Sequence, residues 1–189
     1  RFLVTAEAYA IPSILIFNKL DLFSEEGKGI LAEYMAVYEK IGYPCYAVSA
    51  LNGDNLDTIK ALLTNKTSLF SGHSGVGKSS LINQILPGIE LRTGVISDFS
   101  DSGKHTTTFA EMFELPFGGK LIDTPGIREL GVIDIEKEEL GHFFPEMRQR
   151  LNTCKYHNCV HVNEPGCAVL LALENGEIEP SRYDSYMSI

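Results

Sequence analysis

The residues between 72 and 79 have the types and spacing of a phosphate-binding loop. They read Gly72-His73-Ser74-Gly75-Val76-Gly77-Lys78-Ser79, which is Gly, four residues, then Gly-Lys-Ser. Glycines let successive backbone N–H groups turn inward around a phosphate, and a helix that begins near Lys78 adds its positive dipole end. Lys78 is expected to reach the β- and γ-phosphates and Ser79 to coordinate Mg²⁺. The expected nucleotide contacts are Gly72, Ser74, Gly75, Val76, Gly77, Lys78, Ser79 and Ser80.

A candidate base-recognition segment lies upstream of this loop. Asn18-Lys19-Leu20-Asp21 follows a short apolar run, at a strand end of the kind where α/β sheets place ligand-contacting residues. The Asp21 carboxylate can accept two hydrogen bonds from the N1–H and 2-amino groups of guanine, and adenine offers no such pair of donors. Lys19 is expected to cover the base with its alkyl stem, and Asn18 to tie the segment to the phosphate loop. Ser49-Ala50 ends the next expected strand, where the Ala50 N–H can meet guanine O6.

The order of these segments is unusual, because the base-recognition residues precede the phosphate loop. In a parallel sheet a site depends on which strand ends are neighbours rather than on their order along the chain. A circular permutation that moves the termini into surface connections therefore keeps every contact. The sequence predicts a nucleotide-binding domain with permuted chain order.

A carboxylate also ends a later strand, in the segment Asp123-Thr124-Pro125-Gly126. Asp123 is suited to the surroundings of a bound metal ion, and the Gly126 N–H can contact a γ-phosphate. Both residues are therefore added to the expected nucleotide site.

Hydrophobic patterning predicts the elements that position these residues. Short apolar runs at 14–17, in "CYAVSA" and in "TSLFSG" indicate strands, the first of them buried on both faces. Amphipathic spacing predicts helices over 24–41, opened by Ser24, and over 55–65. "FAEMFELPFGGKLIDTPG" is typical of two strands joined at the "FGG" turn, and 91–108 of a long loop. Strands alternating with helices through 134 predict a layered α/β core.

Three cysteines and a histidine crowd into a short segment near the C-terminus. Cys154, Cys159 and Cys167 lie within 14 residues, with His161 among them and His157 as an alternative nitrogen ligand. Such clustering indicates metal binding before disulfides in a cytosolic protein. Three thiolates and one imidazole form a full tetrahedral set for a structural Zn²⁺.

The charge balance argues against a free-standing nucleic-acid binder. The chain of 189 residues has a formal net charge of −9 and a sequence pI of about 5.0, whereas phosphate contacts need clustered Lys and Arg. We expect no membrane span, because no apolar run approaches the roughly 20 residues that one needs. The start lacks the organisation of a signal peptide, so we expect a cytoplasmic protein.

The order NKLD, SA, GHSGVGKSS, GKHTTT, DTPG, followed by Cys-x4-Cys-x-His-x5-Cys, resembles the circularly permuted family of ribosome small-subunit-dependent GTPases, RsgA/YjeQ. The resemblance runs through essentially the whole chain. It implies an α/β fold with a P-loop NTPase three-layer α/β/α core in permuted order and a small C-terminal helical zinc-binding domain. It also implies hydrolysis of GTP to GDP and phosphate, stimulation by the small ribosomal subunit, and action late in that subunit's maturation. The implied partners of the full-length protein are the small subunit and its rRNA.

The resemblance assigns roles to residues of the loop that follows the phosphate-binding helix. Thr107 is the expected contact to Mg²⁺ and the γ-phosphate. Ile127 stands where many GTPases carry a Gln that orients the attacking water, and His105 is the family's candidate replacement. The expected catalytic residues are therefore His105, Lys78 and Thr107. The family pattern favours His161 over His157 as the fourth zinc ligand.

The expected domains are a permuted GTPase domain over 1–134 and a helical zinc-binding domain over 135–189. Members of the family carry an OB-fold before these, so we expect the chain to be truncated at its N-terminus. We expect a monomer that binds GTP and GDP with Mg²⁺. Two alternatives are a GTP/GDP switch with negligible hydrolysis of its own and an ATPase that uses only the phosphate loop.

Overall fold

The computed structural model describes residues 1–89, 111–123 and 135–189, and these residues pack into two compact units. The first unit comprises Arg1–Leu15, Ala32–Cys45 and the described part of Leu130–Ile189. The second comprises Ile16–Leu31 and the described part of Tyr46–Glu129. Each unit has its own hydrophobic core.

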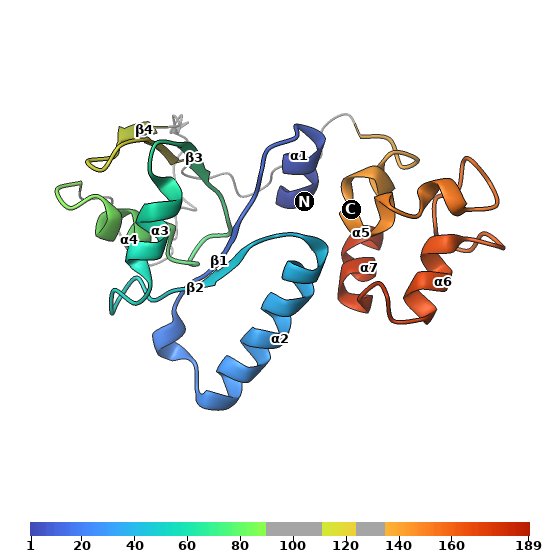
Figure 1. Cartoon of the computed structure of the whole chain (residues 1–189), viewed down its shortest axis with the longest axis horizontal. Coiled ribbons are helices and arrows are strands. Elements are labelled where there is room, and N and C mark those ends of the chain that lie inside the picture. Colours follow the sequence, from blue (N-terminus) through green and yellow to red (C-terminus); the bar gives the residue numbers. More distant parts are fainter. Residues whose placement is uncertain (90–110, 124–134) are drawn as a thin grey trace, which may run out of the picture. The chain divides into compact units, whose positions relative to one another are not determined.

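The second unit, which carries the phosphate loop, contains a three-stranded mixed sheet (Figure 1). Its order is β3 (Thr67–Phe70), β5 (Lys120–Asp123), β4 (Glu111–Glu114), with β3 parallel and β4 antiparallel to β5. The turn between β4 and β5 falls at Gly118 and Gly119, as predicted from the "FGG" sequence. A Cβ on Gly119 would lie 2.7 Å from two backbone carbonyl oxygens, so this close approach requires glycine.

Strands β1 (Leu15–Phe17) and β2 (Cys45–Ala47) form a separate two-stranded sheet. Hydrogen bonds from Leu15 N to Pro44 O and from Val48 N to Phe17 O advance in the same direction along both segments, as in a parallel pair. The prediction of a strand buried on both faces is wrong for β1, whose three residues are only partly buried. In the described part of the chain β1 pairs with β2 alone, which leaves it less covered than a central strand.

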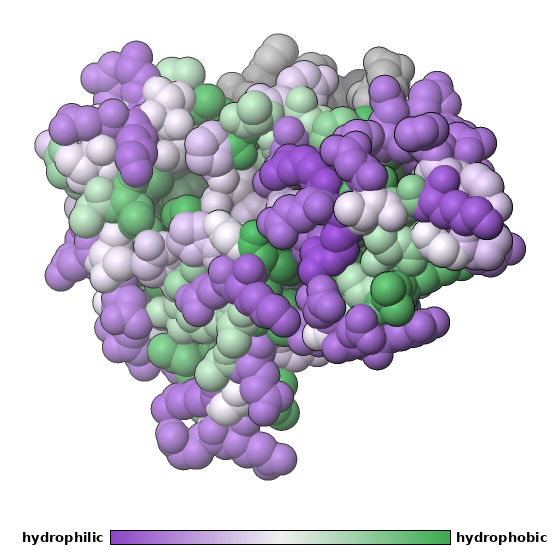
Figure 2. Space-filling view, turned by 45° about the vertical axis from the view of Figure 1, so that its right-hand side comes forward, coloured by the Kyte–Doolittle hydropathy of each residue, from purple (hydrophilic) through white to green (hydrophobic). Residues whose placement is uncertain are grey.

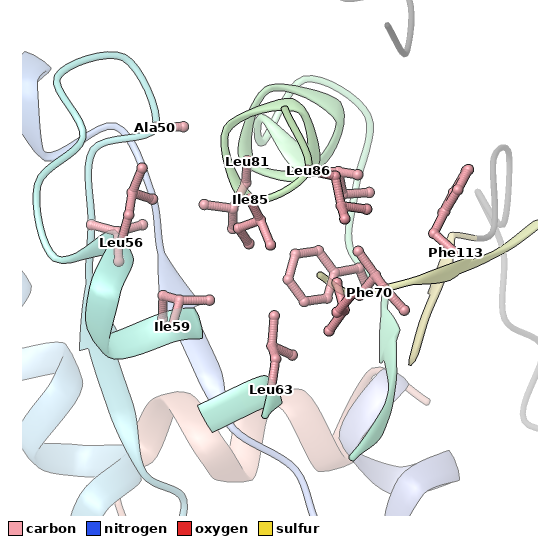
Figure 3. Close-up of a cluster of buried hydrophobic side chains, with 13 residues drawn as sticks. Ala50, Leu56, Ile59, Leu63, Phe70, Leu81, Ile85, Leu86 and Phe113 are labelled. Atoms are coloured by element: carbon pink, nitrogen blue, oxygen red, sulfur yellow. The ribbon is translucent and has the colours of Figure 1, made fainter. Parts of the chain in front are cut away.

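Helices α3 (Leu56–Leu63) and α4 (Lys78–Ile85) bury one face each in the core of the second unit. Leu56, Ile59 and Leu63 recur at the spacing of one helix face and belong to the same buried cluster as Phe70 of β3 (Figure 3). From α4 the apolar residues Leu81, Ile82 and Ile85 join the same cluster. The core therefore fixes α4, and with it the end of the phosphate loop.

Helix α2 (Glu25–Ile41) begins as the sequence predicted. The Ser24 hydroxyl accepts a hydrogen bond from Gly27 N at 3.1 Å, which satisfies one of the donors that a helix start leaves free. Glu25 and Glu26 in the first turn match the positive end of the helix dipole. The short 3-10 helix η1 (Leu20–Leu22) lies between β1 and this helix.

The first unit is helical. Its elements are α1 (Phe2–Ala8), η2 (Leu140–Phe143), α5 (Pro145–Arg148), η3 (Leu151–Thr153), α6 (Ala168–Glu174) and α7 (Pro180–Met187), together with the last turns of α2. Its core gathers fully buried side chains from several of these, among them Phe144, Met147 and Val169. The prediction of a helical, loop-rich region after residue 134 is confirmed for the described residues.

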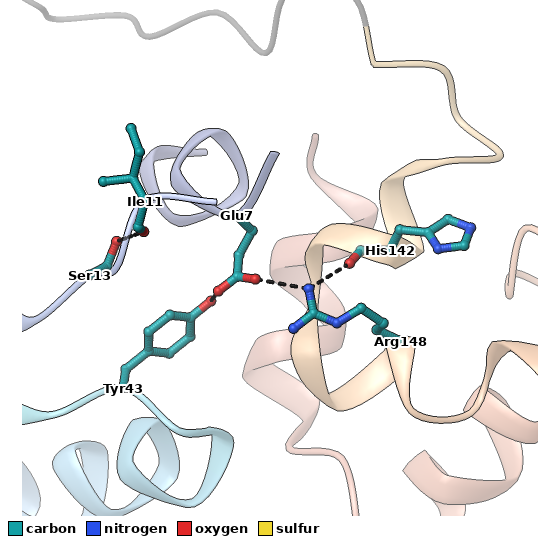
Figure 4. A network of polar contacts seen from close by, with 6 residues as sticks. All are labelled: Glu7, Ile11, Ser13, Tyr43, His142 and Arg148. Carbon is teal, nitrogen blue, oxygen red and sulfur yellow. Dashed lines mark hydrogen bonds and ion pairs between the residues drawn. The ribbon is translucent and has the colours of Figure 1, made fainter. Parts of the chain in front are cut away.

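A polar network joins the N-terminal helix to the C-terminal segment inside this unit (Figure 4). The carboxylate of Glu7 accepts hydrogen bonds from Tyr43 Oη and Arg148 Nη1, both at 3.0 Å. Burial, helped by Glu7, raises the pKa of the Tyr43 phenol above its ordinary value. Segments that are far apart in the sequence are thus held together by one carboxylate.

The packing divides the chain differently from the predicted domains. Residues 1–15 and 32–45, assigned to the nucleotide-binding domain, share a compact unit with the C-terminal segment. The boundary at 134 stays a prediction.

Polar side chains cover most of the face shown in Figure 2, with smaller apolar patches between them. Among the described helices, none combines the length and the apolar character that crossing a bilayer requires.

Candidate functional site

The phosphate loop connects β3 to α4, the strand–loop–helix setting that its sequence predicted. Gly75 and Gly77 have positive φ angles of 80° and 92°, a backbone conformation that residues other than glycine rarely adopt. Helix α4 begins at Lys78 with Gly77 as its N-cap. The free N–H groups of its first turn therefore adjoin the loop, as anion binding requires.

The ammonium group of Lys78 folds across this loop. Its Nζ donates to the carbonyl oxygens of Gly72 at 2.5 Å and His73 at 2.9 Å. A positive charge is thus fixed over the loop by the loop's own backbone. Ser79 and Ser80 follow Lys78 in the first turn of α4.

Asn18 joins the base-recognition segment to the phosphate loop, as the sequence predicted. Its Nδ2 donates to Val76 O at 3.0 Å, and its Oδ1 accepts from Ala50 N, also at 3.0 Å. One amide side chain therefore bridges three segments that are distant in the sequence. The Ala50 N–H is engaged by Asn18 here, and its contact to guanine O6 stays a prediction.

Gly77 makes room for this bridge. A Cβ built on Gly77 would lie 2.3 Å from Asn18 Nδ2, much closer than two such atoms can approach. The glycine therefore serves the tie between the two loops as well as the backbone conformation of the phosphate loop.

The carboxylate of Asp21 is oriented by Ser49. The Ser49 hydroxyl is fully buried, donates to Asp21 Oδ1 and accepts from Asn52 N at 3.1 Å. Ser49 was predicted to contact the nucleotide, and the structure places it in contact with the carboxylate that would do so. Lys19 lies between Asn18 and Asp21 in the left-handed conformation, with φ 70° and ψ 36°.

An open groove of about 410 Å³ follows these residues. It is lined by Asn18, Lys19, Asp21, Leu22, Ala50, Leu51, Gly77, Ser80, Asn83 and Gln84. The groove thus brings together the predicted base-recognition residues and the end of the phosphate loop. Asn83 and Gln84 were missed, although their spacing of three and four residues from Ser80 on one helix could have indicated them.

Asp123, the last residue of β5, is also buried. The predicted residues His105, Thr107 and Gly126 lie outside the described residues, so their assignments stay predictions. Ser74 and Val76 lie in the phosphate loop, both exposed.

The predicted ligands Cys154, Cys159, His161 and Cys167 form a cluster whose four donor atoms all lie within 4.8 Å of one another. His161 Nδ1 is 3.7 Å from Cys154 Sγ and 3.3 Å from Cys167 Sγ. A tetrahedral site with Zn–S bonds of about 2.3 Å and a Zn–N bond of about 2.0 Å has edges of roughly 3.5–3.8 Å. The donor set and its spacing fit such an ion. His157, the alternative ligand, is exposed and outside the cluster.

The cluster's electrostatics also fit a cation. Burial raises the pKa of the Cys159 thiol to about 12, and the neighbouring thiols of Cys167 and Cys154 add to the rise, while a backbone hydrogen bond from His161 opposes it. Burial lowers the pKa of His161, which favours the neutral imidazole that ligates metals. Such crowded thiols ionise readily only beside a positive ion.

Known sequences and solved structures resemble this chain. The profile of the RsgA GTPase family matches residues 1–133. Over its whole length the chain is 51% identical to the small ribosomal subunit biogenesis GTPase RsgA of Bacteroides fragilis, of which it covers 61%. The chain therefore spans about three-fifths of the length of such relatives.

Two solved structures share the fold. The crystal structure of YjeQ from Thermotoga maritima superposes with a TM-score of 0.84 at 40% identity, over 99% of this chain and 62% of that one. YloQ, a circularly permuted GTPase, gives a TM-score of 0.78 at 38% identity, over 99% of this chain and 58% of that one. These likenesses confirm the predicted permuted α/β fold.

Proposed function

The chain belongs to the RsgA GTPase family, and from this we propose that it binds GTP and GDP in the groove between Asp21 and the phosphate loop and hydrolyses GTP. The single observation that carries the proposal is the bridge by Asn18. It holds the base-recognition segment against Val76, inside the phosphate loop, so that one ligand can contact both.

Guanine recognition falls to Asp21. Its carboxylate, held by the buried Ser49, accepts from the N1–H and 2-amino groups of the base. The alkyl stem of Lys19 covers one face of the ring, and the Ala50 N–H meets O6. The polar ends of Asn83 and Gln84, which line the same groove, face the bound nucleotide.

The phosphate end is organised by the loop and its helix. Backbone N–H groups of residues 72–77 and the start of α4 bind the phosphate oxygens, and Lys78 exchanges its loop carbonyls for the β- and γ-phosphates. Ser79 and Thr107 hold Mg²⁺, with Asp123 nearby. The ion neutralises charge that develops on the phosphate oxygens. His105 orients the attacking water, and the Gly126 N–H contacts the γ-phosphate.

The Cys/His cluster has a structural role in this proposal. Cys154, Cys159, His161 and Cys167 hold Zn²⁺ with all four positions filled by protein. The bound ion ties together the chain segments that carry these four residues and so stabilises the folded state of the helical unit.

The whole protein, of which this chain is about three-fifths by comparison with relatives, acts in maturation of the small ribosomal subunit. We place it in the cytoplasm, as a monomer that contacts the subunit and its rRNA and no membrane. Docking on the subunit accelerates hydrolysis of GTP.

Base specificity tests the proposal most directly. In the full-length protein Asp21→Asn should weaken GDP binding by about 100-fold or more and favour xanthosine diphosphate, whose 2-oxo group accepts from the new amide. Asp57→Asn, which makes the same charge change at an exposed site on α3, should alter neither affinity. An unchanged preference in Asp21→Asn would refute the base contact, and equal competition by ATP would refute guanine specificity.

Single-turnover hydrolysis of GTP, with and without small ribosomal subunits, tests the activity. We expect slow turnover that the subunits accelerate and that His105→Ala reduces with little change in GTP affinity. Tight GTP binding without hydrolysis in either condition would instead identify a nucleotide-dependent binding module.

A further inference from the structure

The loop that carries His161 is folded around the carboxylate of Glu164. Glu164 Oε1 accepts from Val160 N at 2.8 Å, and Oε2 accepts from Val162 N at 2.9 Å and Asn163 N at 3.0 Å. Charge-assisted hydrogen bonds of this kind are stronger than neutral ones. One side chain therefore satisfies three backbone donors of the metal-ligand loop, although it is not itself one of the four clustered donors.

The carbonyl oxygens of the same loop are bound by helix α7. Tyr186 Oη donates to Val160 O at 2.8 Å, and Tyr183 Oη donates to His161 O at 2.7 Å. The two tyrosines are three residues apart, so they project from one face of the helix. The loop is thus clamped through its donors by Glu164 and through its acceptors by α7.

These contacts hold His161 in a conformation that it would otherwise avoid. His161 has a φ angle of 57°, in the left-handed region that residues with a Cβ rarely adopt. In this conformation its buried ring directs Nδ1 to within 3.3 Å of Cys167 Sγ. The loop therefore presents the imidazole to the three sulfur atoms through contacts made within the protein.

Helix α7 is docked independently at a second point. Arg182 Nε donates to Glu146 Oε1 at 2.7 Å, and both side chains are more than nine-tenths buried. The guanidinium group also lies 4.9 Å from the centre of the Phe144 ring, whose neighbour at 5.4 Å is the Tyr186 ring. The position of α7 is thus fixed by the core, and its tyrosines carry that position to the metal-ligand loop.

We propose that Glu164 is the positioning residue of the metal centre, and that Tyr183 and Tyr186 link metal binding to the docking of α7. The inference rests on the proposed zinc site and goes beyond it, because it assigns affinity for the ion to residues that do not touch it. Removing groups that orient metal ligands typically weakens binding by about 10- to 100-fold. Linkage is reciprocal, so the bound ion also stabilises α7 in its docked position.

Zinc affinity of the full-length protein tests the first part. Metal-free wild type, Glu164→Gln and Glu174→Gln are titrated with Zn²⁺ against a chromophoric chelator. Glu164→Gln replaces one accepting oxygen by an amide NH₂ and should bind Zn²⁺ about 10- to 100-fold more weakly. Glu174→Gln makes the same charge change at an exposed position at the end of α6 and should match wild type.

Hydrogen exchange tests the link to α7. Zn²⁺ should slow exchange of the α7 amides in wild type, and this protection should shrink in Tyr183→Phe, which removes one hydrogen bond to the loop and keeps the ring. Tyr183→Phe should also weaken Zn²⁺ binding by about 2- to 10-fold. Should Glu164→Gln not fold, Tyr183→Phe carries the test alone.

The outcomes separate the inference from the proposed zinc site. If wild type binds Zn²⁺ and both Glu164→Gln and Tyr183→Phe bind it equally tightly, the inference is refuted and the zinc site stands. If wild type takes up no Zn²⁺, the zinc site and the inference both fail.

Discussion

Replacing Asn18 by aspartate tests the bridge on which the nucleotide site depends. Aspartate keeps the size of the side chain and the oxygen that accepts from Ala50 N. It replaces the Nδ2 donor, which lies 3.0 Å from Val76 O and 3.5 Å from Gly77 O, by a carboxylate oxygen. An attraction between the two loops thereby becomes a repulsion.

The contacts set the size of the effect. Losing the hydrogen bond to Val76 costs about 0.5–1.5 kcal/mol, and leaving its carbonyl opposite a second acceptor adds about 1–2 kcal/mol. The arrangement that brings the loops together is therefore disfavoured by about 2–3 kcal/mol. Since 1.4 kcal/mol corresponds to a tenfold change, GDP affinity should fall by about 30- to 140-fold.

Calorimetric titration with GDP measures this loss, and Asn55→Asp provides the matched control. Asn55 Nδ2 donates to Ala47 O at 2.8 Å, so the same exchange breaks a comparable contact in a segment that does not line the groove. Both variants should have lower melting temperatures than wild type, and only Asn18→Asp should have a lower affinity for GDP. Equal GDP affinities in wild type and Asn18→Asp would refute the role of the bridge.

Three further outcomes follow from the structure. Gly77→Ala places a Cβ 2.3 Å from Asn18 Nδ2 on a residue whose φ angle is 92°. The change should lower the free energy of unfolding by at least about 2 kcal/mol, or the melting temperature by about 4–8 °C, and should also weaken GDP binding. A calorimetric scan that matches wild type would contradict this expectation. Stripping the metal with a chelator should expose the cluster's cysteines to a thiol reagent, and labelling that does not increase argues against a resident ion. Burial, aided by Glu7, raises the pKa of Tyr43 in the folded state, so its contribution to stability is present below pH 10 and is lost as the pH rises further. Urea midpoints should therefore fall more steeply above pH 10 in wild type than in Tyr43→Phe, and parallel slopes would show that Tyr43 does not titrate with unfolding.

Local patterns predicted most elements because each carries its own period and end signals. Helix α2 shows amphipathic spacing after a capping serine, and the β4–β5 turn has two adjacent glycines. The tie between Asn18 and the phosphate loop was also predictable, since an amide at a strand end is a natural partner for a neighbouring loop. Such inferences need only short segments and the rule that strand ends meet at one edge.

Contacts set by tertiary packing escaped the sequence. Asn83 and Gln84 line the groove because the core packing of Leu81, Ile82 and Ile85 decides which face of α4 turns toward it. Ser49 contacts Asp21 because the chain turns after β2, where it forms an isolated bridge with Asp54. These orientations depend on segments far away in the chain.

The metal-ligand loop shows the same limit at shorter range. Ligand types and spacing indicated the ion, but the role of Glu164 depends on backbone N–H groups that converge on it. They converge because His161 adopts a left-handed conformation. The presence of a histidine in a sequence does not predict this conformation. A residue whose side chain bonds only to backbone groups is hard to find from a sequence motif, because every residue has a backbone and no particular partner type marks the contact.

The Asn18 bridge also explains why permuted chain order is compatible with this site. Covalent linkage does little to hold the base and phosphate ends together, since Asn18 and Val76 are 58 positions apart in the sequence. Their distance is set instead by hydrogen bonds from one amide and by a glycine that lets the loops touch. The geometry needed for a nucleotide is thus carried by side-chain contacts between strand ends, and moving the termini elsewhere leaves those contacts unchanged.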